Sequence, residues 1–324
     1  MRKFKGLLFV LMSFVVLLVG CDGDSSMGDV SDKLQIVTTL FPQYDFARII
    51  GGDKVEVSLL LPAGMESHSY EPTPSDMIKI NKADLFIYTG EEMETWAHSI
   101  IESVDSDQVH VLDVSKNISL IVANETEEED HDHDAELEDD HSHEEDDHAG
   151  HNHTYDPHIW TSPKNAMIMV NNILEALCEI DPKNAQYYEA NAKDYLAELG
   201  TLDNEFEEVV ANANRDTIYH GGRFAMQYMT NDYGIHYVSA PFEAEPSAAL
   251  VAQMIKDIKE QNIPVIYYEE LVDPKISQMI SDETGAEMLL LHSCHNVSKE
   301  DFNNGVTYLS LMKQNVENLR VGLN

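Results

Sequence analysis

The pattern of apolar and polar positions predicts short β-strands that alternate with helices over most of the chain. Apolar, β-branched-rich runs bounded by turn residues favour strands, and apolar residues at helical spacing favour helices. Strands are expected at residues 34–40, 55–60, 85–88, 109–114, 217–219, 236–239, 264–268 and 288–291. Helices are expected near residues 46–50, 74–80, 96, 162–180, 183–212, 224–233, 247–259, 274–282 and 302–319. This alternation implies an α/β fold with mostly parallel sheets.

One long helix divides this pattern in two. Residues 183–212 contain no proline and only one glycine, Gly200. A helix of this length spans about 40 Å at the usual rise of about 1.5 Å per residue. We therefore expect a first α/β lobe at residues 34–181, a rigid linking helix at 182–213 and a second α/β lobe at 214–324.

The first residues have the features of an export signal. Three basic residues precede an apolar run at residues 7–19, which is shorter than the roughly 20 residues of a transmembrane helix. The run ends in Leu-Val-Gly-Cys at residues 18–21, which resembles the lipobox of bacterial lipoproteins. We predict a signal peptide at residues 1–20 and, from a lipidated Cys21, a flexible tether at residues 21–33. An ordinary signal peptide with a chance cysteine is the alternative.

Charge and histidine content single out one internal segment. Residues 125–153 carry fifteen Asp or Glu and seven His, with no Lys or Arg. Such a segment cannot build a packed core, but it offers nitrogen and oxygen ligands to a divalent cation such as zinc. The accessory ligands would be His131, His133, His141, His143, His148, His151 and His153. A disordered, solvated loop without a role (within residues 124–154) is the alternative.

The whole chain is acidic, with a formal net charge of −39. This charge repels nucleic acid and attracts cations. Only Cys178 and Cys294 follow Cys21, so a disulfide between these two stays open, but they cannot form a disulfide framework.

Four other histidines lie where predicted strands end and loops begin: His68, His158, His220 and His292. Open α/β sheets bind ligands at the carboxyl ends of their strands. Each predicted lobe supplies two of these histidines, and four neutral imidazoles can complete the tetrahedral shell of zinc. The sequence therefore predicts a metal site in the cleft between the lobes.

Several further polar residues receive a plainer interpretation. The histidines expected to be ordinary loop residues are His98, His110 and His236. Three glutamates, Glu66, Glu269 and Glu270, could orient an imidazole, but exposed loop carboxylates are the favoured interpretation.

Extended motifs around these histidines resemble a known family. The motifs are PAGMESHSYEPTPSD at 62–76, YDPHIWTSPKNA at 155–166, YHGGRFAMQYMTNDYGI at 219–235 and EAEPSAALVAQMIKDIKEQNIPVIYYEE at 243–270. They resemble the zinc and manganese solute-binding lipoproteins of metal ABC importers, also called metal-binding adhesin lipoproteins. The resemblance implies that His68, His158 and His220 are metal ligands.

The chain departs from that family in two places. Where members often carry an acidic residue after the last core strand, this chain reads HSCHN at 292–296. His292 best matches the position, with His295 or a water as alternatives. After His220 the usual acidic residue is replaced by Gly221.

The resemblance implies a zinc-capturing receptor that delivers its ion to an ABC permease and its ATPase subunit. It would be a monomer on the extracytoplasmic face of the cell membrane, anchored by lipid on Cys21, and not an enzyme. Imidazole ligands favour Zn²⁺ over Mn²⁺, and their protonation would weaken binding as pH falls through about 6. A manganese receptor, a surface adhesin or metal-storage protein, and a zinc hydrolase are the alternatives. The last lacks an HExxH motif.

Overall fold

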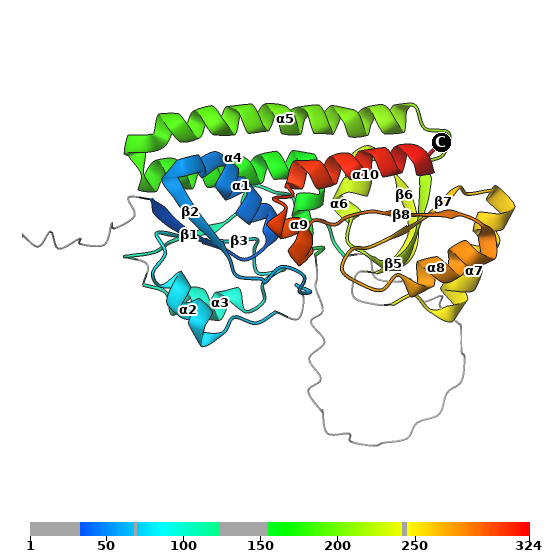
Figure 1. Ribbon diagram of the computed structural model, residues 1–324, viewed down its shortest axis with the longest axis horizontal. Coiled ribbons are helices and arrows are strands. Elements are labelled where there is room, and N and C mark those ends of the chain that lie inside the picture. The colour runs from blue at the N-terminus through cyan, green and yellow to red at the C-terminus, as the bar shows by residue number, and fades with distance from the viewer. Residues whose placement is uncertain (1–32, 68–69, 106, 124–154, 242–244) are drawn as a thin grey trace, which may run out of the picture. The chain divides into compact units, whose positions relative to one another are not determined.

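The computed structural model describes residues 33–67, 70–105, 107–123, 155–241 and 245–324 (Figure 1). The predicted signal peptide, Cys21, His68 and the acidic, histidine-rich segment lie outside these described residues. None of the described helices has the combination of length and apolar character that a bilayer-spanning helix requires.

Four parallel strands form the first sheet, in the order β2-β1-β3-β4. Their bounds are β1 Leu34–Thr38, β2 Val55–Leu59, β3 Leu85–Tyr88 and β4 His110–Asp113. The central strand β3 is buried along its whole length, as expected of a strand covered on both faces. This confirms the strands predicted in the first half of the chain.

A second sheet has the order β6-β5-β7-β8, and all its pairs are also parallel. Its strands are β5 Thr217–Phe224, β6 His236–Pro241, β7 Val265–Tyr268 and β8 Glu287–Leu290. The predicted α/β class with mostly parallel sheets is therefore confirmed.

Helices cover both sheets (Figure 1). The helices of the first half are α1 Phe41–Gly51, α2 Pro74–Ile80, α3 Ala97–Ile101, α4 Pro163–Ile180 and α5 Ala185–Ala211. Those of the second half are α6 Gln227–Tyr233, α7 Ala248–Gln261, α8 Lys275–Thr284, α9 Lys299–Asn303 and α10 Tyr308–Gly322. Short 3-10 turns occupy Gly52–Lys54, Ile159–Thr161 and Pro182–Asn184.

The predicted long helix is α5, which contains 27 residues. It packs against α1, α4 and α10, and Figure 1 shows it running beside α4 and α10. Its buried face carries Tyr188, Tyr195 and Phe206 within a single hydrophobic cluster that draws on both sheets. The helix is therefore part of a continuous core and not an exposed connector. The predicted lobe boundaries remain predictions.

Two predicted elements differ from the structure. Strand β5 extends to Phe224, so His220 lies inside the strand and not just after it. The single helix predicted at residues 302–319 is two helices, α9 and α10. Gly305 takes a left-handed φ of 72°, and the Thr307 side chain caps a new helix by accepting from the Ser310 N–H.

A buried carboxylate joins the ends of β1 and β3. Glu94 is 3% exposed and accepts hydrogen bonds from the Thr39 hydroxyl and, at 3.0 Å, from the Thr89 backbone N–H. Burial outweighs these hydrogen bonds and raises the pKa of Glu94 to about 7.

Glu94→Gln should change how stability depends on pH. The folded pKa exceeds the unfolded value, so the folded state keeps a proton that the unfolded state loses between pH 4.5 and about 7. The wild-type protein therefore loses stability as pH rises through this window. We expect the variant to be more stable by about 1–3 kcal/mol at pH 8 and nearly equal to wild type at pH 4.5 in urea unfolding.

The matched control is Glu102→Gln, which removes the same charge from an exposed position. Only Glu94→Gln should gain stability over wild type at pH 8. If the free energies of unfolding of wild type and Glu94→Gln changed with pH in parallel, this explanation would be contradicted.

Candidate metal centre

The carboxyl ends of three strands in the second sheet bring the candidate residues to one edge. His220 lies opposite Tyr267 in the β5–β7 pair, so it is adjacent to the end of β7. Glu269 and Glu270 follow β7 directly, and His292 follows β8 by two positions. Parallel strands present these ends on the same side of the sheet, as the sequence predicted.

His220 is held neutral by its surroundings. His220 is 2% exposed, and this burial lowers the pKa of its imidazole to about 4. Its Nδ1 accepts a hydrogen bond from the Gly222 N–H at 3.3 Å, a long and weak contact. A neutral, buried imidazole suits a metal ligand, because protonation would block the lone pair.

Close packing explains why residue 221 is a glycine. A Cβ at this position would lie 2.3 Å from the Ser277 Oγ and 3.0 Å from backbone atoms of the same residue. Only glycine lets β5 approach the first turn of α8 this closely. The family's acidic residue after the third ligand would therefore not fit here.

Glu270 is the organising carboxylate of the second sheet's edge. It is 7% exposed and accepts from the Ser293 N–H at 2.9 Å and the Ser293 Oγ at 2.6 Å. Its Oε1 also lies 3.0 Å from the Nδ1 of His295 and 3.5 Å from that of His292. The expectation of an exposed loop carboxylate is wrong for Glu270, because the chain after β8 folds over it.

Electrostatics keep Glu270 ionised despite its burial. Burial alone would raise the pKa of Glu270, but His292, His295 and Ser293 together hold it well below its usual value. For His295 burial alone would lower the pKa, but the hydrogen bond with Glu270 and the negative charge of that carboxylate raise the pKa above its usual value. The carboxylate therefore favours an N–H at the Nδ1 of His295.

His292 and His295 differ in the nitrogen that they can offer. The Nδ1 of His292 accepts from the Cys294 N–H at 2.9 Å, so its neutral form carries the proton on Nε2. The Nδ1 of His295 faces a carboxylate, so in the neutral form of this ring the proton is on Nδ1 and the lone pair on Nε2. That Nε2 is buried without a hydrogen-bond partner among the described residues. His295 thus has the better ligand geometry of the two.

Asp156 gives His158 a similar arrangement. The Oδ1 of Asp156 lies 2.8 Å from the Nδ1 of His158 and also accepts from its backbone N–H at 2.8 Å. Both residues are buried, at 0% and 1% exposed. A carboxylate on Nδ1 fixes the ring orientation and places the lone pair on Nε2, as in metal-binding carboxylate–histidine pairs. The residue pattern DPH held this signal, although only the histidine was predicted.

Hydrogen bonds join the described residues on either side of the acidic, histidine-rich segment. Val122 and Tyr155 form an antiparallel bridge, and the Asp156 N–H donates to Ile121 O at 2.8 Å. The Tyr228 hydroxyl in α6 donates to Asp156 O at 2.8 Å and accepts from the Ile121 N–H at 3.1 Å. The described residues on either side of the segment are therefore joined to one another and to Asp156, the partner of His158.

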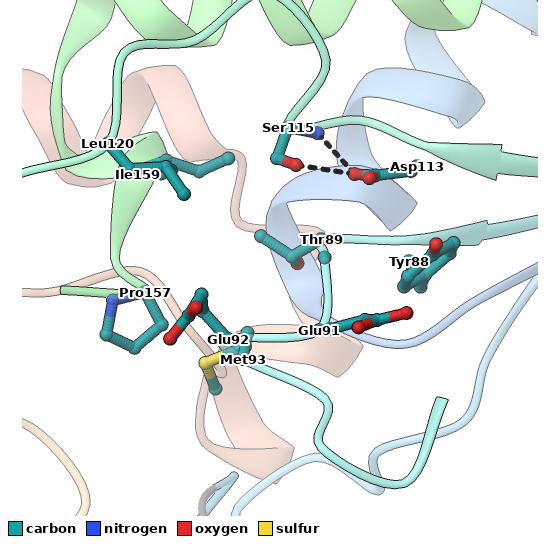
Figure 2. Close-up of a pocket in the computed structure, with 11 residues that line it drawn as sticks. Tyr88, Thr89, Glu91, Glu92, Met93, Asp113, Ser115, Leu120, Pro157 and Ile159 are labelled. Atoms are coloured by element: carbon teal, nitrogen blue, oxygen red, sulfur yellow. Dashed lines mark hydrogen bonds between the residues drawn. The ribbon is translucent and has the colours of Figure 1, made fainter. Parts of the chain in front are cut away.

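A pocket of about 250 Å³ lies at the ends of β3 and β4. Figure 2 shows Glu91, Glu92 and Pro157 around it, with Asp113 accepting two hydrogen bonds from Ser115. Neither His158 nor any other predicted ligand is among its described lining residues. This pocket is acidic, but it is separate from the predicted histidine set.

Comparison with known proteins identifies the family. The family profile described as "Zinc-uptake complex component A periplasmic" matches residues 36–322. The chain belongs to this family. It is 37% identical over 329 residues to the high-affinity zinc uptake system protein ZnuA of Bacillus subtilis, covering 99% of this chain and 98% of that protein.

Two further relatives extend the comparison. The chain is 33% identical to the zinc-binding lipoprotein AdcA of Streptococcus pneumoniae but spans only 61% of its length. The Zn(II)-bound ZnuA-like domain of AdcA superposes with a TM-score of 0.73 at 29% identity, covering 90% of this chain and 99% of the domain. The laminin-binding protein Lmb of Streptococcus agalactiae superposes with a TM-score of 0.72 at 26% identity, covering 90% and 100%. Lmb is described as bifunctional, with adhesin and metal transporting activity.

The structure leaves the complete ligand set as a prediction. His158, His220 and His292 are all buried, whereas His68 lies outside the described residues. Within the described part of the chain, no three His, Cys, Asp or Glu side chains form a group that could hold a metal ion.

The remaining candidates have structural roles. His98 belongs to α3, while His110 and His236 begin β4 and β6, so none of them is a loop residue. In the described residues Cys178 and Cys294 are free thiols. Burial raises the pKa of Cys294 well above its usual value, which keeps this thiol protonated.

Asp156→Asn should weaken zinc binding roughly 10–100-fold, because the carboxylate no longer orients the His158 ring. Asp181→Asn is the matched control. Asp181 is also buried and accepts two hydrogen bonds, from Asn184 and Tyr188, but it caps the end of α4. Calorimetric zinc titration should separate the two variants, and equal affinities would show that Asp156 does not act through the site.

Proposed function

We propose that this protein captures Zn²⁺ on the outer side of the cytoplasmic membrane and delivers it to the permease of an ABC importer. Membership of the zinc-uptake family gives the class of activity. The observation that carries the proposal is the pairing of buried carboxylates with imidazoles, Asp156 with His158 and Glu270 with His295. The partners would be the permease and its ATPase subunit.

The proposed ligands are His68, His158, His220 and a fourth histidine. His292 was expected in the fourth position, and His295 is favoured because its buried Nε2 has no hydrogen-bond partner in the part of the chain that the structure describes. If His292 bound the metal through Nε2, its proton would have to be on Nδ1, and the hydrogen bond that Nδ1 accepts from the Cys294 N–H at 2.9 Å would be lost. Ligation by His220 would cost only the weaker 3.3 Å contact.

Ligand chemistry selects the metal. Imidazole suits zinc, whereas manganese prefers carboxylate and carbonyl oxygen. Glu270 and Asp156 are engaged with imidazoles or backbone N–H groups, so they act on the metal through the ligands. A site of neutral imidazoles is thus a zinc site, and the manganese alternative is weaker.

The proposal also includes roles for Cys21 and for the acidic, histidine-rich segment. Lipid on Cys21 would tether a monomer to the outer face of the membrane. Residues 125–153 would bind several ions weakly and raise their concentration at the segment that carries His158. An adhesive role is the second candidate, because Lmb combines adhesin and metal transporting activity. The zinc hydrolase alternative is set aside, because the family is a solute-binding component of zinc uptake.

Zinc titration of the protein from residue 22 onward tests the site. His295→Ala should weaken the tight site by more than about 100-fold, a greater loss than for a residue that only orients a ligand. His292→Ala should have a smaller effect, and the exposed His98→Ala should have none. A larger loss in His292→Ala than in His295→Ala would return the fourth position to His292.

Deleting residues 125–153 tests the loop separately. One tight zinc site should remain and the weak sites should disappear. Loss of the tight site on deletion would show that the loop supplies a ligand.

A further inference from the structure

The segment His292–Val297, here called the cross-lobe segment, leaves β8 of the second sheet and contacts the first half of the chain. Asn296, which is 0% exposed, donates through Nδ2 to Pro62 O at 2.9 Å and to Met65 O at 2.8 Å. The Gly64 N–H donates to Val297 O at 2.8 Å. Three hydrogen bonds therefore join this segment to one turn, Pro62–Met65, which follows β2.

Two more hydrogen bonds reach other parts of the first half. The Trp160 Nε1–H donates to Ser293 O at 2.7 Å, two residues after His158. The Phe41 N–H, at the start of α1, donates to His295 O at 3.2 Å. The cross-lobe segment is thus bonded to the turns that follow β1 and β2 and to the segment that carries His158.

The second half holds the other end of the same segment. Asn315 of α10 is fully buried, accepts from the His292 N–H at 2.8 Å and donates to His292 O at 2.8 Å. Glu270 holds Ser293 as described above. The backbone of the segment is therefore fixed from both sides.

Asn296 is the only side chain of the cross-lobe segment that hydrogen-bonds the Pro62–Met65 turn among the described residues. Both of its amide donor contacts go to backbone carbonyls, and its Oδ1 accepts from the Val297 N–H at 2.9 Å. Replacing it by alanine would leave two carbonyls without this donor. Of the three hydrogen bonds between the turn and the segment, only the one from the Gly64 N–H to Val297 O would then remain.

We infer that Asn296 is a positioning residue for metal binding, which fixes the turn before His68 against the segment that carries His295. The inference rests on the proposed function. His295 is thereby held against the first half, which carries His158, while Glu270 and Asn315 fix the same segment to the second half. Holding ligands in place before zinc arrives lowers the ordering cost of binding.

The test compares zinc affinity in Asn296→Ala and Asn172→Ala. Asn172 is a matched control because its buried Nδ2 also donates to two backbone carbonyls, Val114 O at 3.0 Å and Lys116 O at 2.9 Å. We expect similar losses of thermal stability. Zinc affinity should fall roughly 10–100-fold only in Asn296→Ala, as for other outer-sphere residues. Asn296→Asp, which keeps the size but loses the donors, should bind like Asn296→Ala.

Equal affinity in Asn296→Ala and Asn172→Ala would overturn the inference, as would wild-type affinity in Asn296→Asp. A wild-type protein without a tight zinc site would instead contradict the proposed function, so the two failures are distinguishable.

Hydrogen exchange of the wild-type protein tests the same inference without any substitution. The Gly64 and Phe41 amides donate into the cross-lobe segment and should be protected in the zinc-free protein as strongly as in the zinc-bound protein. Rapid exchange of both amides without zinc would show that these contacts are not in place before zinc binds, and would overturn the inference.

Discussion

The buried carboxylate of Glu270 is the interaction on which the candidate site depends. It stays ionised in a desolvated position because Ser293 donates two hydrogen bonds to it and the Nδ1 of His295 lies 3.0 Å away. A buried charge without such partners would be strongly destabilising. The chain after β8 must therefore fold over Glu270, and this requirement places His295 with its Nδ1 against the carboxylate.

The same principle recurs in the first half of the chain at Asp156. Each carboxylate fixes an imidazole tautomer and so decides which nitrogen faces away from it. Glu270 lies just after β7 of the second sheet, Asp156 lies in the loop before α4, and α5 and α10 join the two sheets through one continuous hydrophobic cluster. The fold thus supplies rigidity, while the carboxylates supply ligand orientation.

Strand positions and the long helix were predictable from sequence because each depends on local apolar periodicity. The break between α9 and α10 was missed because apolar spacing continues across Gly305 and Thr307. His220 was placed after its strand because the glycines that follow it resemble a turn, but Gly221 is required by the approach of Ser277.

The candidate site was predictable only in part. His158 and His220 stand in recognisable motifs, although their burial was not predicted. The burial of Glu270 and the contacts of Asn296 come from residues more than 20 and 230 positions away, respectively. No local pattern could indicate them. The preference for His295 over His292 likewise depends on which ring nitrogen meets a carboxylate and which meets a backbone N–H.

A crystal structure of the zinc-loaded protein, with anomalous scattering at the zinc edge, tests the central claim most directly. The account predicts one strong site at about 2.0–2.1 Å from the Nε2 atoms of His158, His220 and His295, with Glu270 still on the Nδ1 of His295. Zinc bound to His292 with His295 unliganded, or to the carboxylate of Glu270 itself, would contradict it.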